Sequence, residues 1–250
     1  MSTGYATTTA PSTTPETGSD QKGHAMSVGL RVLKRHRAVD AELAAKFREL
    51  PVANVSDSMN RMTGGGARLR PMHAGGPLSG PAVTVRTRPG DNLLIHMALD
   101  IAEPGDVVVV DAGGDLTNAV FGELMLAIAI QKKLGGIVID GAIRDYAAIR
   151  AGDFPVYAAG VTHRGPFKDG PGEVNVPIAI DGMTIEPGDL IVGDDDGLLA
   201  VPFDGAEEIY EVADRKRADE LVKARHNAAG TSDRSRIRDK LVALGAHFEL

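Results

Sequence analysis

Hydrophobic and polar positions recur along the chain with two different periods, and the period changes repeatedly. Apolar residues three or four apart are typical of a helix with one buried face, whereas short continuous apolar runs are typical of strands buried on both faces. Asp40 and Asp91 precede helical patterns and are suitable N-caps. The elements predicted in this part are a helix at 41–50, a helix beginning at Ser56 or Asp57, a strand at 81–87 and a helix at 92–101.

The middle of the chain has the rhythm of a parallel α/β protein. Apolar runs alternate with helical patterns, and glycines mark the turns between them. This β-α-β-α-β order predicts strands that pair in parallel through right-handed crossovers. The predicted elements are strands at 107–111, 136–140 and 155–159, with helices from near Phe121 to Leu134 and from Arg144 to Ala151.

The last part of the chain has a different character. Residues 163–177 are rich in glycine and proline, and strands are predicted at 190–192 and 197–201 as a hairpin. Asp194-Asp195-Asp196 lies between them, and we interpret it as a solvated turn, because the other ligand positions of an EF-hand are absent. From Asp204 onward the chain is helical and highly charged, which predicts a surface for contact with a neighbouring subunit.

Composition narrows the class of protein. The chain of 250 residues is 43% hydrophobic and 24% charged, as expected for a globular domain. Residues 1–25 are rich in Thr, Ser, Pro and Gly, which predicts a disordered tail before an α/β domain at 26–203 and a helical extension at 204–250. Because the chain has no cysteine, disulfides, thiolate zinc sites and cysteine nucleophiles are excluded.

Charge and hydropathy indicate the compartment and the kind of partner. The net charge of −7 disfavours a nucleic-acid partner, because such proteins usually carry a basic face. No apolar run approaches the roughly 18 residues of a membrane span, and the first residues lack the apolar core of a signal peptide. We therefore expect a cytoplasmic protein that binds neither nucleic acid nor membranes.

The most informative segment is Gly135–Asp145, in which an apolar strand ends in small residues and an arginine and an aspartate follow at once. Ligands of α/β proteins bind beyond the carboxyl ends of such strands. Arg144 can hold a carboxylate through two hydrogen bonds, and Asp145 can hold a hard cation such as Mg²⁺. This interpretation predicts a site for an anionic, metal-chelating small molecule; the alternative is a surface ion pair at a helix start.

A second segment, Gly113–Met125, leads into a predicted helix and offers free backbone N–H groups to an anion. It matches neither a Walker loop nor a dinucleotide-binding loop, and an ordinary turn between strand and helix is the alternative. Twenty residues separate Glu123 from Arg144, and they hold one predicted helix and one predicted strand. We therefore expect both residues at the same edge of the sheet.

The pattern Gly122-Glu123, twenty residues, Arg144-Asp145 resembles the Gly-Asp/Glu-x20-Arg-Asp signature of the RraA-like family. The resemblance implies an α/β fold: a swivelling β/β/α domain with a central mixed, partly parallel sheet, here with a C-terminal helical extension. It also implies a homo-oligomer, either a trimer or a hexamer. The similarity extends from about Val52 to Pro202 and includes the segments Val109–Gly114, Asp140–Asp145 and Arg164–Gly170.

The enzymatic branch of this family comprises class II pyruvate aldolases, which act on 4-hydroxy-4-methyl-2-oxoglutarate (HMG) and 4-carboxy-4-hydroxy-2-oxoadipate (CHA). The resemblance implies that Arg144 holds the carboxylate or keto oxygen of the substrate, and that Asp145 holds Mg²⁺ or Mn²⁺. It implies that Glu123 is a catalytic-site residue, although Glu stands here where Asp is frequent. The residues whose backbone amides are implied to bind the pyruvyl end are Gly122, Glu123, Leu124 and Met125.

In these aldolases a neighbouring subunit contributes an acidic residue that orients metal-bound water, and by spacing the counterpart here is Glu220. A solvated helix face is the alternative explanation for Glu220. His163 lies in a loop where lining the site is one alternative, and we interpret it as a structural loop histidine; His96 shows no ligand spacing. Lys168 and its neighbour Asp169 fit either an interface or the site.

The implied chemistry is consistent with these residue types. Retro-aldol cleavage develops an enolate, which a metal chelated by the α-keto acid stabilises as a Lewis acid, so no Schiff-base lysine is needed. Loss of CO₂ from oxaloacetate gives the same enolate, which makes decarboxylase activity an expected companion.

Two other activities compete with the aldolase. One branch of the family inhibits an RNA-degrading endonuclease through protein contacts, but it is shorter at the C-terminus, so residues 204–250 favour the enzyme. A methyltransferase acting on demethylmenaquinone is disfavoured, because the chain has no glycine-rich loop for S-adenosylmethionine.

Overall fold

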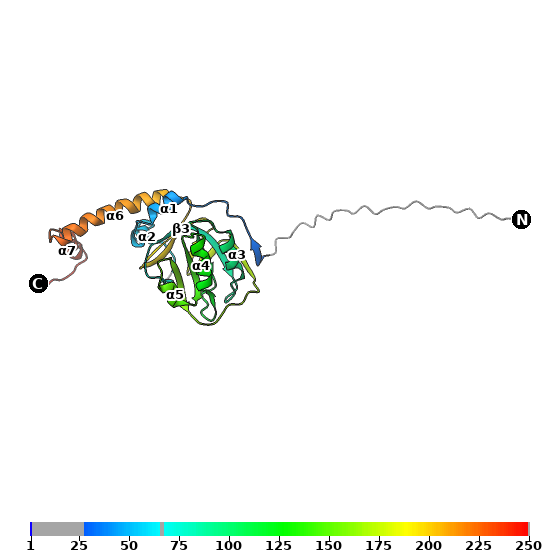
Figure 1. Cartoon of the computed structure of the whole chain (residues 1–250). Helices are drawn as coiled ribbons and strands as arrows, with labels where there is room; N and C mark the ends of the chain where they lie inside the picture. The colour runs from blue at the N-terminus through cyan, green and yellow to red at the C-terminus, as the bar shows by residue number, and fades with distance from the viewer. Residues whose placement is uncertain (2–27, 66–67, 250) are drawn as a thin grey trace.

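The computed structural model describes residue 1, residues 28–65 and residues 68–249, and shows a mixed α/β fold (Figure 1). The predicted disordered tail at 1–25 lies outside the described residues except for Met1. The strands are β1 (Leu30–Val32), β2 (Arg70–Pro71), β3 (Leu78–Thr87), β4 (Val107–Asp111), β5 (Ala119–Phe121), β6 (Gly136–Ile143), β7 (Val156–Val161), β8 (Gly172–Val174), β9 (Ile178–Ile180), β10 (Met183–Ile185), β11 (Leu190–Asp194) and β12 (Gly197–Val201). The helices are α1 (Ala41–Phe47), α2 (Val52–Ser58), α3 (Leu93–Ile101), α4 (Glu123–Gln131), α5 (Tyr146–Arg150), α6 (Ala206–Ala228) and α7 (Ser235–Ala243).

The centre of the fold is a parallel sheet in the order β3-β4-β6-β7, which confirms the predicted pairing. The valines of β4 are fully buried, because both faces of the strand are covered. Antiparallel neighbours complete the sheet: β8 and β11 pair with β3, and β12 forms the predicted hairpin with β11. The sheet is therefore mixed and partly parallel, as expected.

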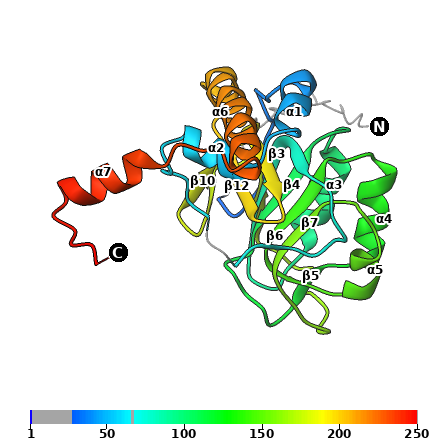
Figure 2. The same ribbon diagram turned by 90° about the vertical axis from the view of Figure 1, so that its left-hand side faces the viewer.

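Helices cover the two faces of the sheet separately. Side chains of α3 and α4 form one hydrophobic cluster with the strands, whereas α1, α2 and the first part of α6 contribute to the other. Figure 2 shows α3, α4 and α5 on one side of the strands and α1, α2 and α6 on the other. The carboxyl ends of the parallel strands lie beside the starts of α4 and α5.

Several element boundaries differ from the prediction. Helix α2 begins at Val52 rather than at Ser56 or Asp57, because Pro51 has a fixed φ and needs no N–H donor at a helix start. The helix predicted from near Phe121 begins at Glu123, because residues 119–121 form β5 instead. Strand β6 continues past Asp140 to Ile143, where β5 pairs with its end.

Two further differences concern α5 and β8. Helix α5 begins at Tyr146 rather than Arg144, because Asp145 is in the left-handed conformation with φ 56°. The segment 163–177 contains the short strand β8, which was not predicted because Gly172 and its neighbours lack a strand pattern.

The C-terminal helices project from the body of the molecule (Figure 1). Helix α6 packs against α2, yet only Ala206 and Ala213 of α6 are buried, and α7 has no buried residue. The predicted helical extension is confirmed, with its interruption between Ala228 and Ser235. Within the described part of the chain, no helix has both the length and the apolar character needed to cross a membrane.

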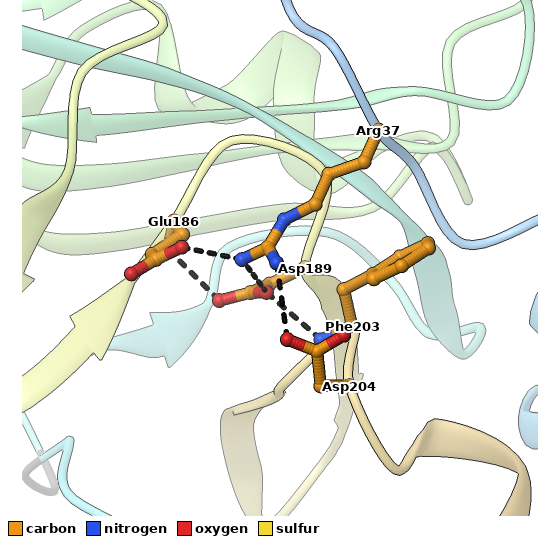
Figure 3. A network of polar contacts seen from close by, with 5 residues as sticks. All are labelled: Arg37, Glu186, Asp189, Phe203 and Asp204. Carbon is orange, nitrogen blue, oxygen red and sulfur yellow. Dashed lines mark hydrogen bonds and ion pairs between the residues drawn. The ribbon is translucent and has the colours of Figure 1, made fainter.

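An ionic network around Arg37 fixes the start of this extension (Figure 3). The Arg37 guanidinium pairs with Glu186, lies 3.2 Å from Asp204 and sits over the Phe203 ring. Asp189 accepts hydrogen bonds from the backbone amides of Glu186 and Phe203 at 2.8 and 2.9 Å. The network thus ties the segment before α1 to the segment that leads into α6.

Candidate active site at the end of strand β6

Arg144 and Asp145 lie immediately after β6, at the carboxyl edge of the parallel strands. The Arg144 amide donates to the Phe121 carbonyl at 2.9 Å, which fixes the turn against the end of β5. Asp145 adopts φ 56°, a conformation that aspartate tolerates better than most residues. Both side chains are about two-fifths exposed, so they are accessible to a ligand.

The start of α4 meets this turn directly. The Glu123 backbone amide donates to Asp145 Oδ2 at 3.0 Å, and Arg144 Nε lies 3.7 Å from the same oxygen. The structure therefore brings together the two segments that the sequence places at one sheet edge. Of the predicted amides, those of Glu123 and Met125 have protein acceptors, whereas that of Leu124 has no acceptor within the described residues.

Gly122 allows this close approach. A Cβ atom at position 122 would lie 2.6 Å from Asp145 Oδ2 and 3.0 Å from Arg144 Cγ. The φ of Gly122 is −161°, which is ordinary extended backbone, so the requirement for glycine comes from space and not from conformation. The absent side chain at Gly122 therefore helps to define where the arginine and the aspartate lie.

A pocket opens between the turn after β6 and helices α3 and α4. Arg144, Asp145, Gly122, Leu124 and Met125 all line it, which groups most of the predicted site residues in one hollow. The Glu123 side chain is exposed and does not line this pocket, so only its backbone amide takes part in the observed geometry. The remaining lining residues are Asn92, His96, Ala119, Val120, Phe121, Pro166 and Lys168.

A second hollow also includes the Arg144-Asp145 pair. It is lined by these two residues together with Val161, Thr162 and His163. His163, for which lining the site was the alternative to a structural role, lies beside the candidate site.

The Asp145 carboxylate fits a cation site that is completed by water and substrate. Its Oδ2 accepts the Glu123 amide, and its Oδ1 has no hydrogen-bond partner within residues 28–65 and 68–249. The described residues contain no cluster of three or more His, Cys, Asp or Glu side chains suited to a metal. One carboxylate with a largely hydrated ion is the arrangement that Mg²⁺ commonly adopts with chelating substrates.

Glu220 lies elsewhere on its own chain. It is on α6, where it accepts a hydrogen bond from Asn54 at 2.7 Å and lies 3.7 Å from Lys216. Helices α5 and α6 lie on different flanks of the molecule (Figure 2), so Glu220 does not reach the pocket of the same chain. Its predicted role in a neighbouring subunit stays a prediction.

Asn92 and His96 are pocket residues that the sequence did not indicate. They lie four residues apart on α3 and its cap, a spacing that points both side chains to one face of a helix. That spacing is the only sequence signal, and it is as common in ordinary helices as in sites. Their role depends on the tertiary contact between α3 and the loop that carries Lys168.

Comparison with known proteins identifies the family of this chain. The family model described as RraA-like, Aldolase/RraA, matches residues 52–200, which is more than half of the chain. The chain is 38% identical over 210 residues to the "Putative 4-hydroxy-4-methyl-2-oxoglutarate aldolase" of Halalkalibacterium halodurans, covering 84% of this chain and 95% of that protein. The match of 52–200 agrees with the predicted extent of the resemblance.

Solved structures show the same fold. An uncharacterized protein from Pseudomonas syringae superposes with a TM-score of 0.71 at 26% identity, over 79% of this chain and 97% of that one. Streptomyces coelicolor RraAS2, described as an unusual member of the RNase ES inhibitor RraA family, superposes with a TM-score of 0.68 at 28% identity, over 75% and 98%. The chain therefore belongs to the RraA-like family.

Proposed function

We propose that this protein is a divalent-metal-dependent class II aldolase. It cleaves a 4-hydroxy-2-oxo acid of the HMG or CHA type to pyruvate and a second oxo acid, and it decarboxylates oxaloacetate as a side activity. The observation that carries the proposal is the convergence of Arg144, Asp145 and the start of α4 on one pocket. The relationship to a protein named as a possible aldolase of this type supports it.

The two charged residues have different tasks in this proposal. Arg144 binds the carboxylate or keto oxygen of the substrate, because its guanidinium lines the pocket and is paired only loosely, at 3.7 Å, with Asp145. Asp145 would hold Mg²⁺ or Mn²⁺ through its carboxylate. When bound, the cation supplies Lewis acidity toward an α-keto acid. The Leu124 amide would donate to the pyruvyl end, since Leu124 lines the pocket at the N-terminus of α4 and its amide has no acceptor among the described residues.

The apolar wall of the pocket has a role as well. Val120, Phe121 and Met125 are buried and line the hollow beside the charged pair. An apolar wall excludes water from the substrate, which strengthens the hydrogen bonds that Arg144 makes to a developing negative charge.

We further propose that the protein works as a trimer or hexamer. In this arrangement Glu220 of one subunit approaches the Asp145 site of the next and orients water there. The exposure of α6 beyond its buried Ala213 supports this, because the carboxylate lies on a helix that projects from its own chain.

The test measures pyruvate release from HMG and from oxaloacetate, with Mg²⁺ or with EDTA. Asp145→Asn preserves the shape of the side chain and tolerates the positive φ, but removes the charge. We expect about 100-fold lower kcat and loss of Mn²⁺ binding measured by electron paramagnetic resonance. Asp153→Asn is the matched control, because Asp153 is exposed in the turn after α5 and lines neither hollow.

Two results would contradict the proposal. Absence of pyruvate release by the pure protein from both substrates, with metal present, excludes the aldolase. Full metal-dependent activity of Asp145→Asn shows instead that the cation is held elsewhere.

A regulator of ribonuclease activity is the second candidate. The structural match to RraAS2, a protein described as belonging to a family of RNase inhibitors, favours it. On this alternative the protein binds a ribonuclease without catalysis, and substitutions at Arg144 and Asp145 leave the inhibition unchanged. A ribonuclease cleavage assay with wild-type protein and Asp145→Asn separates the two functions.

A further inference from the structure

We propose that a hollow at the far end of α3 from the candidate active site binds an α-amino acid with an aliphatic side chain. This distal hollow lies between the segment before α1, the end of α3 and the start of β4. Its volume is about 280 Å³, close to the lower limit for ligand pockets, which suits a small molecule. The distal hollow shares no residue with the pocket of Arg144 and Asp145, so it lies outside the proposed aldolase function.

Helix α3 separates the two sites. Asn92, just before the helix, lines the candidate active site, whereas Ile101, its last residue, lines the distal hollow. The helix has 9 residues, which span about 14 Å along its axis. A ligand the size of an amino acid bound beside Ile101 therefore occupies a site of its own.

Asn175 lines the distal hollow and carries a buried acceptor without a donor. The residue is 8% exposed, and its Nδ2 donates to the Leu33 carbonyl at 2.9 Å, but its Oδ1 has no hydrogen-bond partner in the described part of the chain. The φ of 57° suits asparagine, and the bond to Leu33 orients the amide, yet neither of these features uses Oδ1. Buried polar atoms are almost always paired, so this oxygen points to a ligand that donates a hydrogen bond.

Two of the charged residues that line the distal hollow are already paired. Arg35 Nη1 donates to Asp106 Oδ1 at 2.7 Å, and Asp106 is buried. The second oxygen of this carboxylate accepts the Glu103 amide at 2.8 Å. Arg35 and Asp106 therefore fix the wall of the hollow and leave the binding of a ligand's charges to other residues.

Lys34 and Glu103 are the charges that a ligand can reach. Lys34 is exposed, and within residues 28–65 and 68–249 no carboxylate lies within ion-pair distance of it. The Glu103 side chain is 79% exposed and lies only near Arg35, at 3.9 Å. One cation and one anion match a zwitterion, whose carboxylate pairs with Lys34 and whose ammonium donates to Glu103 and to Asn175 Oδ1.

The rest of the lining is apolar. Leu33 and Val83 line the distal hollow beside the polar residues, and Val83 is buried. An aliphatic side chain placed against them is removed from water, which favours binding. In an α-amino acid the ammonium, the carboxylate and the side chain all leave one carbon atom, so a single small molecule satisfies all three kinds of contact.

The test is isothermal titration calorimetry of the full chain with L-leucine and with two analogues that each lack one charged group. 4-Methylpentanoate has no ammonium, and 3-methylbutylamine has no carboxylate. We expect wild-type protein to bind L-leucine at one site per chain and to bind each analogue about 10-fold more weakly.

Lys34→Met and Glu103→Gln separate the two charged contacts. Lys34→Met should weaken L-leucine about 3- to 10-fold and change 3-methylbutylamine less than twofold, because the amine has no carboxylate to lose. Glu103→Gln should weaken L-leucine to a similar degree and leave 4-methylpentanoate unchanged. Lys223→Met is the matched control, because Lys223 is exposed on α6 and does not line the distal hollow.

Asn175→Gly tests the buried acceptor, since glycine tolerates the positive φ at this position. We expect L-leucine and 3-methylbutylamine to bind about 10-fold more weakly to this variant, and the affinity for 4-methylpentanoate to change less than twofold. Equal losses for all three ligands assign Asn175 a structural role and overturn its part in the site.

Arg144→Gln distinguishes the distal hollow from the candidate active site, and it should leave the affinity for L-leucine unchanged. Loss of L-leucine binding in this variant, or no binding to wild-type protein up to about 10 mM, overturns the proposal even if pyruvate is released. Binding that depends on Lys34 and Glu103, in a protein that releases no pyruvate from any 4-hydroxy-2-oxo acid, supports the amino-acid site and removes the aldolase.

Discussion

At the scale of single residues, the site depends as much on a missing side chain as on the charged ones. Gly122→Ala places a methyl group 2.6 Å from Asp145 Oδ2, so the aspartate and the adjacent arginine must move. A displacement of this size misaligns a substrate, and we expect kcat for pyruvate release to fall about 10- to 100-fold. The nearest atom belongs to a movable side chain rather than to backbone, so the fold should persist.

Differential scanning fluorimetry checks the second half of this prediction. The melting temperature of Gly122→Ala should stay within about 3 °C of wild type, because the atoms that the added Cβ meets belong to the side chains of Asp145 and Arg144, which can move. Gly152→Ala is the control, since a Cβ there meets only the Ile149 carbonyl at 3.9 Å. Full activity in Gly122→Ala means that the close approach of Asp145 to α4 is not needed for the reaction.

At the scale of elements, β8 is held between β1 and β3 by one buried carboxylate. Glu173 pairs with Arg31 of β1 and with Arg86 of β3, and it also accepts the Gly29 amide at 3.0 Å. The hydrogen bond from Arg31, with help from Gly29 and Arg86, outweighs burial and lowers the pKa of Glu173 to about 2. The ionised carboxylate is therefore part of the folded structure.

The consequence is a defined dependence of stability on pH. Because the pKa is lower in the folded state, the stabilisation is complete above the unfolded value of about 4.5 and disappears as the pH falls toward 2. We expect Glu173→Gln to lower the free energy of unfolding by about 3 kcal/mol at pH 7. Urea titrations at pH 7 and pH 3 measure the difference between the two proteins, which should shrink at the lower pH. A difference that stays constant, or grows, at pH 3 contradicts the assignment.

Strands β4 and β8 and helix α2 show which elements could be predicted from the sequence and which could not. Strand β4 is an unbroken run of four valines, and its predicted bounds are exact because nothing but a doubly covered strand buries such a run. Strand β8 was missed because its three residues pair through a tertiary contact with Arg31 and Arg86 rather than through a local pattern. The early start of α2 was missed because Pro51 was not recognised as a helix start.

The candidate site, too, could be predicted only in part from the sequence. Arg144, Asp145 and Gly122 were found because two short motifs lie at the ends of neighbouring elements, and sheet topology fixes where such ends meet. The sequence alone could not place Asn92 and Lys168 in the same pocket. They line one pocket because the loop of Lys168 binds the segment before α3: Asp91 accepts the amides of Asp169 and Gly170, and the Asn92 amide donates to the Phe167 carbonyl. No local pattern encodes these contacts.

At the scale of the whole molecule, an apolar face next to the pocket is open to solvent in the single chain. Leu93, Met97 and Ile101 form a stripe along α3, each between 36% and 40% exposed, and Leu124 and Ile128 are exposed on the neighbouring helix α4. A stripe of this kind beside a pocket is typical of a surface that another protein chain covers. We expect this face to be the contact between subunits of the proposed trimer, with the pocket at its margin.

Met97→Asp tests this assignment, because a charge in the middle of the stripe cannot be buried without a partner. Size-exclusion chromatography with light scattering should give wild-type protein a mass of three or six times the 26.2 kDa chain, and the variant the mass of one chain. Met97→Leu keeps an apolar side chain of similar volume and should retain the assembly. If Met97→Asp elutes at the mass of the wild-type assembly, the subunits meet elsewhere, and the exposed apolar side chains of α6 and α7, such as Leu221 and Val242, become the surface on which the assembly depends.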